Sequence, residues 1–481
     1  MKLTVNDIVG ATNGRLLRGD GQPAIHDGQP AGLAGDSEVK GVSIDSRTIK
    51  PGHVFFALRG VRFDGHAFIP DVERMGAACA VVEERYWKEG SVSPDFRIIG
   101  VKDTRASLGD LASFIRRRRR IPLVAVGGTS GKTTTKEMIA SILARSMTVL
   151  KTSGNMNNLV GVPLTLVSLN NVHDAAVVEL GISEPGEMRR LSRICAPDVA
   201  VITNVGRAHL EKLGSMEKIA EEKTELYASL AENGVRVVNL DDPLVVRFTE
   251  GHKTEKVTFS RKKDADVCIK EFSFAAGEAN AVTVLYGVRG TELRARINSP
   301  LLSNIYNGAA AIATVLPLGV AAEDIRQGLD SFVPPGGRME ILKVGAWTVL
   351  NDTYNANPDS TLAALKTLAS MNGRKVTVIG SMLELGSGSE EAHAEAGRLA
   401  ATLGVDVLVT VGRWREAVRD GALSGGMKEK NVFGFDDNAE TASEIKRILK
   451  DGDIVLVKGS RAARMEEIVE ALKGLNGMNG V

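Results

Sequence analysis

Ile121-Pro-Leu-Val-Ala-Val-Gly-Gly-Thr-Ser-Gly-Lys-Thr-Thr-Thr135 is the stretch that decides the fold of this chain. Its apolar run, Leu123 to Val126, is typical of a buried strand, and a helix is predicted to start at Lys132. The turn between them has the composition of a phosphate-binding loop, in which backbone N–H groups and a helix N-terminus surround anionic oxygens. The sequence therefore predicts a nucleoside triphosphate site here.

The loop residues have predicted roles. Lys132 is expected to reach the terminal phosphates, and the Thr133 hydroxyl is expected to hold Mg²⁺. The common loop has a glycine where this chain has Val126, so the loop is a shortened variant. A glycine-rich turn that binds nothing is disfavoured, because strand, turn and helix all fit. The predicted contacts of the loop are Gly127, Gly128, Thr129, Ser130, Gly131, Lys132, Thr133 and Thr134.

The composition is that of an ordinary soluble globular protein. The 481 residues are 43% hydrophobic and 25% charged, with a net charge of +1 at pH 7, which gives no reason to expect a nucleic-acid or membrane partner. No segment has the length of a membrane span or the pattern of a signal peptide. Three widely separated cysteines without metal spacing favour a reducing compartment. We expect a cytoplasmic, monomeric enzyme without nucleic acid or membrane insertion.

Hydrophobic periodicity predicts an α/β protein of three domains. Residues 1–120 are expected to form a mixed α/β domain, residues 121–337 a nucleotide domain with a mostly parallel sheet, and residues 338–481 a Rossmann-like domain without the dinucleotide fingerprint. Residues 265–297 are expected to be antiparallel strands. The other predicted strands are Met147–Lys151, Ala175–Leu180, Val199–Val205, Thr348–Asn351, Lys375–Ile379, Asp406–Val411 and Ile454–Val457.

Two segments of the first domain stand apart. Gly19–Asp36 is rich in glycine and proline and is predicted to be a loop. Arg116 to Arg120 end a predicted helix, and could be a nucleic-acid patch or solvated cations at a helix C-terminus. We favour solvated cations, at the joint between two domains.

Polar residues follow two predicted strands of the nucleotide domain. Glu179 ends one strand, and His209 follows another. Ligands of α/β sheets bind at the carboxyl ends of strands, so these residues and Thr133 are candidate Mg²⁺ ligands. An exposed carboxylate and a loop histidine that binds nothing are the alternatives.

Lys223 occupies an unusual position in the predicted helical stretch Ser215–Asn233. It falls on the apolar stripe of that stretch, where a lysine either extends to solvent or lies in a pocket with a lowered pKa. The residues alone favour extension to solvent.

Taken together, these motifs resemble the ATP-dependent Mur ligases of bacterial cell-wall synthesis. The resemblance covers essentially the whole chain. It rests on Gly128–Thr134, on Thr152–Asn158 with Val162-Pro163, and on Glu179, His209 and Lys223. Ser130 departs from the family, which more usually has asparagine there. The resemblance implies ATP, two Mg²⁺ ions and a Lys223 carboxylated by CO2 that helps to hold the second ion, which reverses the reading from the residues alone.

Flanking motifs indicate which member of the family the chain resembles. Ser43–Arg47, Phe55–Arg59 and Asp64–Phe68 look like the UDP-substrate domain of the two later ligases, and Asn351–Ser360 is similar to the member that adds D-alanyl-D-alanine. The Asp-Asn-Pro-Arg sequence of the diamino-acid-adding member is missing. The resemblance therefore implies ligation of D-alanyl-D-alanine to UDP-N-acetylmuramoyl-tripeptide through an acyl-phosphate.

The resemblance also assigns site residues. Catalytic roles are implied for Lys132, Glu179, His209 and Lys223; ATP contacts for Asn304, Asn307, Arg338 and Asp352; and substrate contacts for Ser46, Arg47, Asn155, Asn158, Tyr354, Asn355 and Asn357. Asn304 could instead be a helix N-cap. Lys458–Arg461 could meet an anion or be a solvated turn.

Three other functions fit less well. A folate polyglutamylating ligase normally begins with its ATPase domain, whereas about 120 residues precede the loop here. A GTPase would need a guanine-reading Asn-Lys-x-Asp sequence, which this chain lacks. An inert scaffold is disfavoured because every position of the phosphate site is filled.

Overall fold

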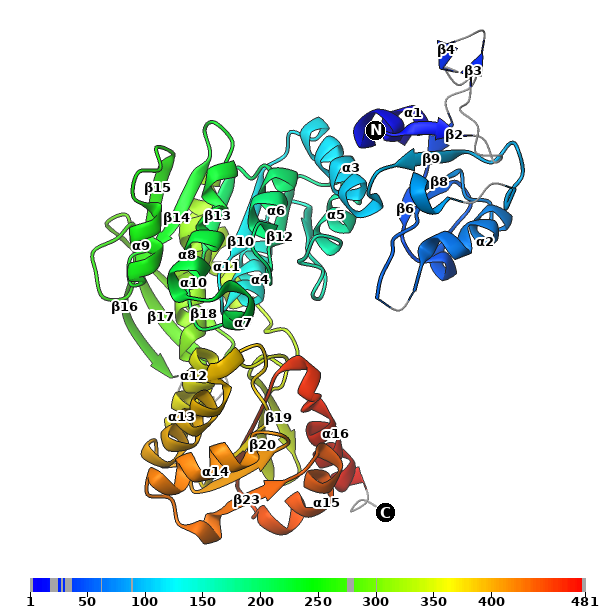
Figure 1. Ribbon diagram of the computed structural model, residues 1–481. Helices are drawn as coiled ribbons and strands as arrows, with labels where there is room; N and C mark the ends of the chain where they lie inside the picture. Colours follow the sequence, from blue (N-terminus) through cyan, green and yellow to red (C-terminus); the bar gives the residue numbers. More distant parts are fainter. Residues whose placement is uncertain are drawn as a thin grey trace. The chain divides into compact units, whose positions relative to one another are not determined.

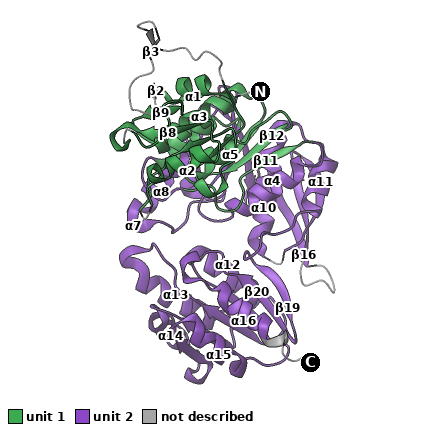
Figure 2. Cartoon of the chain, turned by 90° about the vertical axis from the view of Figure 1, so that its right-hand side faces the viewer, with its two compact units in different colours: residues 1–125, 147–181, 187–198 green, residues 126–146, 182–186, 199–481 purple. Residues whose placement is uncertain are grey.

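The computed structural model describes residues 3–17, 25–26, 29–30, 37–61, 63–87, 90–274, 281–299 and 301–477. The chain forms two compact units (Figure 2). Unit 1 comprises residues 1–125, 147–181 and 187–198, and unit 2 comprises residues 126–146, 182–186 and 199–481. Among the described residues, no helix is long and apolar enough to cross a membrane.

The first part of unit 1 is a five-stranded sheet with the order β2-β9-β8-β7-β6. Strands β6 to β9 pair in parallel, and β2 runs antiparallel to β9. The strands are β2 (Arg15–Leu17), β6 (Gly41–Ser43), β7 (His53–Phe56), β8 (Cys79–Glu83) and β9 (Ile98–Val101), and the helices are α1 (Val5–Thr12), α2 (Ile69–Arg74) and α3 (Thr104–Arg118). All five residues of β8 are buried, as expected for a continuous apolar run in a parallel sheet. The mixed α/β prediction is confirmed.

Little of the predicted loop Gly19–Asp36 can be described. Strands β3 (Ile25–His26) and β4 (Gln29–Pro30) pair with each other in antiparallel fashion. The rest of the loop lies outside the described residues.

The second part of unit 1 contains strands β11 (Val149–Lys151) and β12 (Ala175–Glu179), which pair in parallel. Helices α5 (Gly161–Leu166) and α6 (Glu187–Cys195) follow them in sequence. The backbone N–H groups of Ala176 and Asp198 donate to the carbonyls of Pro122 and Leu123, both over 2.9 Å. Strand β10 (Leu123–Gly127) thus begins beside β12 and beside the residues that lead into β13.

Arg116 corrects the prediction for the arginine run. Its side chain is buried, and its guanidinium donates to Cys195 O over 3.0 Å, to Ile121 O over 3.0 Å and to Asp198 Oδ2 over 2.7 Å. The cation therefore holds the end of α3 to the end of α6 and is not solvated. Arg117 and Arg118 are exposed, as predicted.

Unit 2 contains the greater part of the nucleotide sheet, in the order β13-β14-β15-β16-β17-β18. Strands β13 to β16 pair in parallel and β16 to β18 pair antiparallel, as predicted. The strands are β13 (Val199–Ile202), β14 (Val235–Asn239), β15 (Glu255–Ser260), β16 (Val267–Phe274), β17 (Val282–Val288) and β18 (Thr291–Ile297). Helices α4 (Lys132–Leu143), α10 (Leu302–Val315) and α11 (Ala322–Asp330) accompany them, with α4 packed against α10 and α11 (Figure 1).

The carboxyl-terminal part of unit 2 is a six-stranded sheet with the order β19-β20-β24-β21-β22-β23. Only β19 is antiparallel to its neighbour. The strands are β19 (Glu340–Val344), β20 (Trp347–Asp352), β21 (Lys375–Ile379), β22 (Val407–Val411), β23 (Val432–Phe435) and β24 (Ile454–Lys458). Neighbouring residues Val349 and Leu350 belong to different apolar clusters, because successive side chains point to opposite faces.

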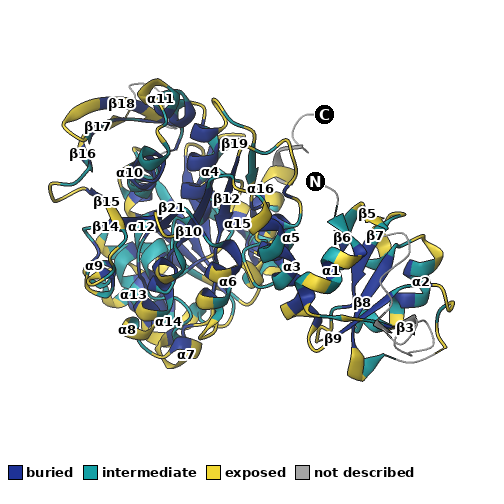
Figure 3. Cartoon of the chain, turned by 90° about the horizontal axis from the view of Figure 1, so that it is seen from above, coloured by how far each residue is buried: buried dark blue, intermediate teal, exposed yellow. Residues whose placement is uncertain are grey.

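Helices cover both faces of this sheet. Residues of α12 (Pro358–Ala369), α13 (Ser389–Thr402) and α14 (Arg415–Ser424) belong to one cluster, and residues of α15 (Asn438–Ile448) and α16 (Glu466–Gly477) belong to the other. Strands β22 and β24 are buried throughout, whereas the edge strands β19 and β23 are partly exposed (Figure 3). The Rossmann-like, doubly wound prediction is confirmed.

Candidate active site

The predicted phosphate loop lies between the end of β10 and the start of α4. Gly128 and Gly131 have φ angles of 130° and 81°, which glycine adopts at little cost. A Cβ atom on Gly128 would lie 2.0 Å from Thr203 Oγ1, and one on Gly131 would lie 2.4 Å from Asn307 Oδ1. These glycines therefore let two other segments approach the loop backbone closely. The predicted strand, glycine turn and helix are confirmed.

Residues that follow β13 hold the loop in place. Thr203 Oγ1 donates to Ser130 O over 2.7 Å, and Asn204 accepts from Ser130 N over 3.0 Å. The Thr129 hydroxyl accepts from Gly206 N over 2.8 Å. Asn204 was not among the site residues selected from the sequence, whereas the structure makes it a residue that positions the loop.

Two lysines converge on one carbonyl of the loop. Lys132 Nζ donates to Gly128 O over 3.0 Å and to Thr129 O over 2.9 Å. Lys223 Nζ, from helix α8 (Met216–Thr224), donates to Gly128 O over 2.9 Å. Both lysines selected from the sequence therefore lie at the phosphate loop.

Lys223 is buried, with 2% of its surface exposed, so extension to solvent is wrong. The apolar stripe on which it lies faces the protein interior, and the side chain follows it inward. Burial lowers the pKa of Lys223 well below its usual value, and the positive charge of Lys132 lowers it further. These surroundings favour the neutral amine.

Thr133 contacts the carboxyl-terminal part of unit 2. Its hydroxyl accepts from Arg338 Nη2 over 2.8 Å, and the Arg338 guanidinium lies 3.8 Å from the centre of the Tyr354 ring. This stacking is a cation–π contact that holds the guanidinium in place. The structure thus brings three predicted residues together at the first turn of α4.

His209 lies beside a carboxylate that sequence reasoning missed. His209 Nδ1 is 2.5 Å from Glu384 Oε2, and both residues have left-handed backbones, with φ of 58° and 63°. The pKa of Glu384 is lowered, mainly by its hydrogen bond with His209. No sequence signal marked Glu384, because it lies on a distant loop of the carboxyl-terminal part.

Asp352 has two described partners in the carboxyl-terminal part of unit 2. Asp352 Oδ2 accepts from Lys458 Nζ over 2.5 Å, and Oδ1 accepts from Met339 N over 3.1 Å. Lys458 is 2% exposed and also donates to Asn355 O over 3.0 Å, so it is not part of a solvated turn. The described contacts of Asp352 lie within the carboxyl-terminal sheet.

The predicted adenine-contacting pair forms one buried hydrogen-bonded unit. Asn307 Nδ2 donates to Asn304 Oδ1 over 2.9 Å, and Asn304 Nδ2 donates to Ser299 Oγ over 2.7 Å. Leu301 occupies the N-cap position of α10, so the N-cap alternative for Asn304 is wrong. Asn307 also lies against Gly131 of the phosphate loop.

The segment Tyr354–Ser360 approaches the phosphate loop through one side chain. Asn357 caps helix α12 by accepting from Ser360 N over 2.8 Å, and its Nδ2 donates to Ser130 Oγ over 3.3 Å. Asn355 uses its own side chain to accept from Ala356 N. Asn357 is therefore the asparagine of this motif that the structure places at the loop.

Unit 1 holds the predicted glutamate. Glu179, 2% exposed, accepts from Asn157 Nδ2 over 2.8 Å, and its backbone N–H donates to Thr152 Oγ1 over 2.9 Å. Asn158 Oδ1 accepts from Gly161 N over 2.9 Å at the start of α5, and the Asn155 carbonyl accepts from Asn157 N. Asn157, which was not selected from the sequence, is thus a partner of Glu179.

Ser46 and Arg47 line a hollow of about 490 Å³ in unit 1, with Phe68, Asp71, Arg74 and Met75. Arg47 is largely exposed and pairs with Asp45 over 2.6 Å. Its hydrogen bonds lower the pKa of Asp45 to about 2. Both predicted substrate residues are therefore accessible to a ligand.

The described residues contain no cluster of three or more His, Cys, Asp and Glu side chains that could hold a metal ion. The predicted ligands in unit 2 are the Thr133 hydroxyl, the His209 imidazole, whose Nδ1 lies 2.5 Å from Glu384 Oε2, and Lys223. The Thr133 hydroxyl is an oxygen ligand of the kind that Mg²⁺ prefers.

Comparison with known proteins gives three family matches. Residues 38–116 match the Mur ligase family catalytic domain, residues 126–315 the Mur ligase middle domain, and residues 337–461 the Mur ligase glutamate ligase domain. The UDP-N-acetylmuramoyl-tripeptide–D-alanyl-D-alanine ligase of Bacillus subtilis is 34% identical over 441 residues, covering 90% of this chain and 93% of the relative.

Two crystal structures are similar along nearly the whole chain. MurF from Acinetobacter baumannii has a TM-score of 0.88 and 32% identity, covering 98% of this chain and 99% of that chain. MurF ligase from Thermotoga maritima in complex with ADP has a TM-score of 0.81 and 30% identity, covering 91% of this chain and 98% of that chain.

Proposed function

Because the chain belongs to the Mur ligase family, we propose that it joins D-alanyl-D-alanine to UDP-N-acetylmuramoyl-tripeptide at the expense of ATP. The product is the pentapeptide precursor of peptidoglycan. The observation that carries this proposal is the contact between the motif Asn351–Ser360 and the phosphate loop, from Asn357 to Ser130. Arg338, which stacks on Tyr354 of that motif, adds a second contact to Thr133. Nucleotide and acceptor would then share one site.

The reaction has two chemical steps. A carboxylate oxygen at the end of the tripeptide attacks the γ-phosphorus of ATP, giving an acyl-phosphate and ADP. The amine of D-alanyl-D-alanine then attacks the acyl carbon, loses a proton and expels phosphate. Such transfers depend on positioning and on neutralising charge, so lysines and backbone N–H groups suffice without a side-chain nucleophile.

The residues of unit 2 would divide this work. Lys132 would neutralise the transferred phosphoryl group. Arg338, which contacts Thr133 in the first turn of α4, would approach the same phosphoryl group. Asn304 and Asn307 would contact the adenine, as the position of Asn307 against Gly131 supports. Asp352 stays a predicted nucleotide contact, although its described partners are structural.

Mg²⁺ would be held by Thr133 and His209, with Glu179 also a predicted ligand, and would neutralise phosphate charge when bound. We further propose that Lys223 is carboxylated by CO2. A buried amine with a lowered pKa can add CO2, and the carbamate would supply oxygens that a hard cation prefers.

The domain limits 1–120, 121–337 and 338–481 are proposed to separate UDP-substrate binding, ATP binding and acceptor binding. Ser46 and Arg47 would bind the UDP-substrate, and Asn155 and Asn158 would belong to the second substrate loop. Tyr354 and Asn355 would lie beside the acceptor. We also propose a cytoplasmic location and a monomer.

Phosphate release by the purified chain tests the function. ATP, Mg²⁺ and UDP-N-acetylmuramoyl-tripeptide are supplied with and without D-alanyl-D-alanine, and the pentapeptide product is identified by mass. Release that depends on D-alanyl-D-alanine is expected. If free D-alanine, meso-diaminopimelate or glutamate is a much better acceptor, the assigned acceptor is wrong.

The carboxylation of Lys223 has its own test. Mass spectrometry under CO2-saturated, non-acidic conditions should find one added carboxyl group at Lys223, and Lys223→Arg should be inactive because guanidinium keeps its charge. An unmodified Lys223 together with a fully active Lys223→Arg variant would exclude the carbamate.

A further inference from the structure

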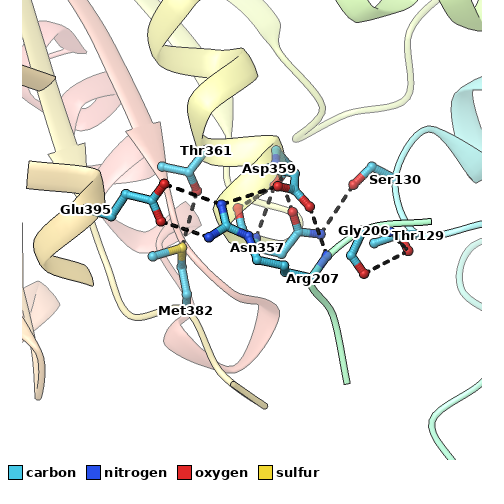
Figure 4. A network of polar contacts seen from close by, with 10 residues as sticks. Thr129, Ser130, Gly206, Arg207, Asn357, Asp359, Thr361, Met382 and Glu395 are labelled. Atoms are coloured by element: carbon cyan, nitrogen blue, oxygen red, sulfur yellow. Dashed lines mark hydrogen bonds and ion pairs between the residues drawn. The ribbon is translucent and has the colours of Figure 1, made fainter. Parts of the chain in front are cut away.

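The loop that follows β13 joins the two parts of unit 2 through Arg207. Its backbone N–H donates to Asp359 Oδ2 over 2.9 Å, and its guanidinium donates to Glu395 Oε2 over 2.9 Å and more weakly to Asp359 Oδ1 over 3.4 Å. Asp359 lies in the first turn of α12, and Glu395 lies on α13. One residue thus ties two helices of the carboxyl-terminal part to the nucleotide part (Figure 4).

The same loop touches the phosphate loop on its other side. Thr129 Oγ1 accepts from the neighbouring Gly206 N over 2.8 Å, and Ser130 Oγ accepts from Asn357 over 3.3 Å. Phosphate loop, Gly206-Arg207 and the start of α12 therefore form a closed ring of contacts, whose members lie side by side in Figure 4.

Gly206 shows how closely these segments approach. A Cβ atom there would lie 2.5 Å from Asp359 Oδ2 and 3.3 Å from Thr129 Cγ2. A methyl group there would displace the Asp359 carboxylate, which accepts from the Arg207 backbone N–H. This close fit distinguishes the contact from an isolated surface ion pair, which typically adds little to stability.

We propose that Arg207 is a positioning residue that sets the acceptor motif, residues 354–360, at the correct distance from the phosphate loop. This inference rests on the proposed function. Arg207 has no predicted contact with the reacting atoms. It acts through Asp359 and Glu395, which hold the helix that begins where the acceptor motif ends. Loss of the contacts from Arg207 to Asp359 and Glu395 should impair attack by the amine more than formation of the acyl-phosphate.

Two measurements separate these steps in the full chain. Acyl-phosphate formation is followed without D-alanyl-D-alanine by adding hydroxylamine, whose nitrogen attacks the acyl carbon and expels phosphate to give a hydroxamate. Ligation is followed with D-alanyl-D-alanine. A misplaced reactant can cost about 100-fold, so Arg207→Ala should lower kcat for ligation by about 10- to 100-fold and raise the KM for D-alanyl-D-alanine. Hydroxamate formation and the KM for ATP should stay within about twofold of wild type.

Three further variants sharpen the test. Arg207→Lys keeps the charge but loses the guanidinium fork, so it should recover part of the ligation. Glu395→Gln removes a partner that lies outside every predicted motif and should reproduce a weaker form of the defect. Arg419→Ala is the matched control, because Arg419 is similarly exposed and pairs with Glu429 over 2.6 Å within the carboxyl-terminal part; it should leave both reactions unchanged.

The possible failures differ. The positioning role alone would be overturned if Arg207→Ala ligates like wild type. It would also be overturned if Arg207→Ala and Glu395→Gln both lose hydroxamate formation and ligation in parallel. A wild-type chain that makes neither hydroxamate nor pentapeptide would overturn the proposed function, and the inference with it.

Discussion

The pair formed by Lys458 and Asp352 should contribute strongly to the stability of the carboxyl-terminal sheet. Lys458 is 2% exposed and Asp352 is 13% exposed at the side chain, so both charges are largely removed from water. Lys458→Met would leave the carboxylate with Met339 N as its remaining described partner. Breaking a buried pair costs about 3–5 kcal/mol, and we expect the lower end because that hydrogen bond persists.

Hydrogen–deuterium exchange in the full chain measures this effect locally, which matters because a chain with several domains need not unfold in one step. A loss of about 3 kcal/mol corresponds to roughly 100-fold faster exchange in strands β20 and β24 where exchange follows the opening equilibrium. Lys473→Met is the matched control, since Lys473 forms an exposed pair with Glu470 over 2.8 Å. That variant should exchange like wild type.

A double variant tests the physical reason. If the cost arises from an unpaired buried carboxylate, Asp352→Asn combined with Lys458→Met should exchange more slowly than Lys458→Met alone. Unchanged exchange in Lys458→Met, or no recovery in the double variant, would refute the reasoning.

Other substitutions test the assigned site. Lys132→Ala should remove nearly all ligation while circular dichroism stays unchanged, and near wild-type turnover at saturating ATP and Mg²⁺ would contradict its role. Gly128→Ala should weaken ADP binding in calorimetry and lower stability by about 1–3 kcal/mol, because alanine is strained at its φ and its methyl meets Thr203; normal binding would contradict the close approach. Deleting residues 338–481 should abolish ligation, and persistent pentapeptide formation would exclude an acceptor site there.

Local patterns allowed most elements to be predicted from the sequence. The strand predicted at Lys375–Ile379 is observed with the same limits. Strands β14 and β15 were missed, although β14 is buried throughout. Buried Arg236 and Asn239 interrupt the apolar run of β14, whereas β10, which was predicted, has an uninterrupted one.

Site residues were predictable where a local motif demanded them. Glycine spacing placed Lys132 correctly, whereas apolar periodicity alone misplaced Lys223, because periodicity cannot tell a long side chain that reaches solvent from one that ends at a buried carbonyl. Periodicity also failed to predict the burial of Arg116. This side chain donates hydrogen bonds to Cys195 O and Asp198, which lie about 80 residues away in the sequence.

Three residues whose contacts were not predicted from the sequence have strained backbones. His209, Met339 and Glu384 are non-glycine residues with φ between 55° and 63°, a conformation that costs about 1–3 kcal/mol each. His209 lies against Glu384 across the two parts of unit 2, whereas Met339 N contacts Asp352 within the carboxyl-terminal part. Since local preferences oppose these conformations, tertiary contacts must offset their cost. For His209 and Glu384 the offset comes from their contact with each other, which joins two segments that are far apart in the sequence, so no local pattern could have predicted it.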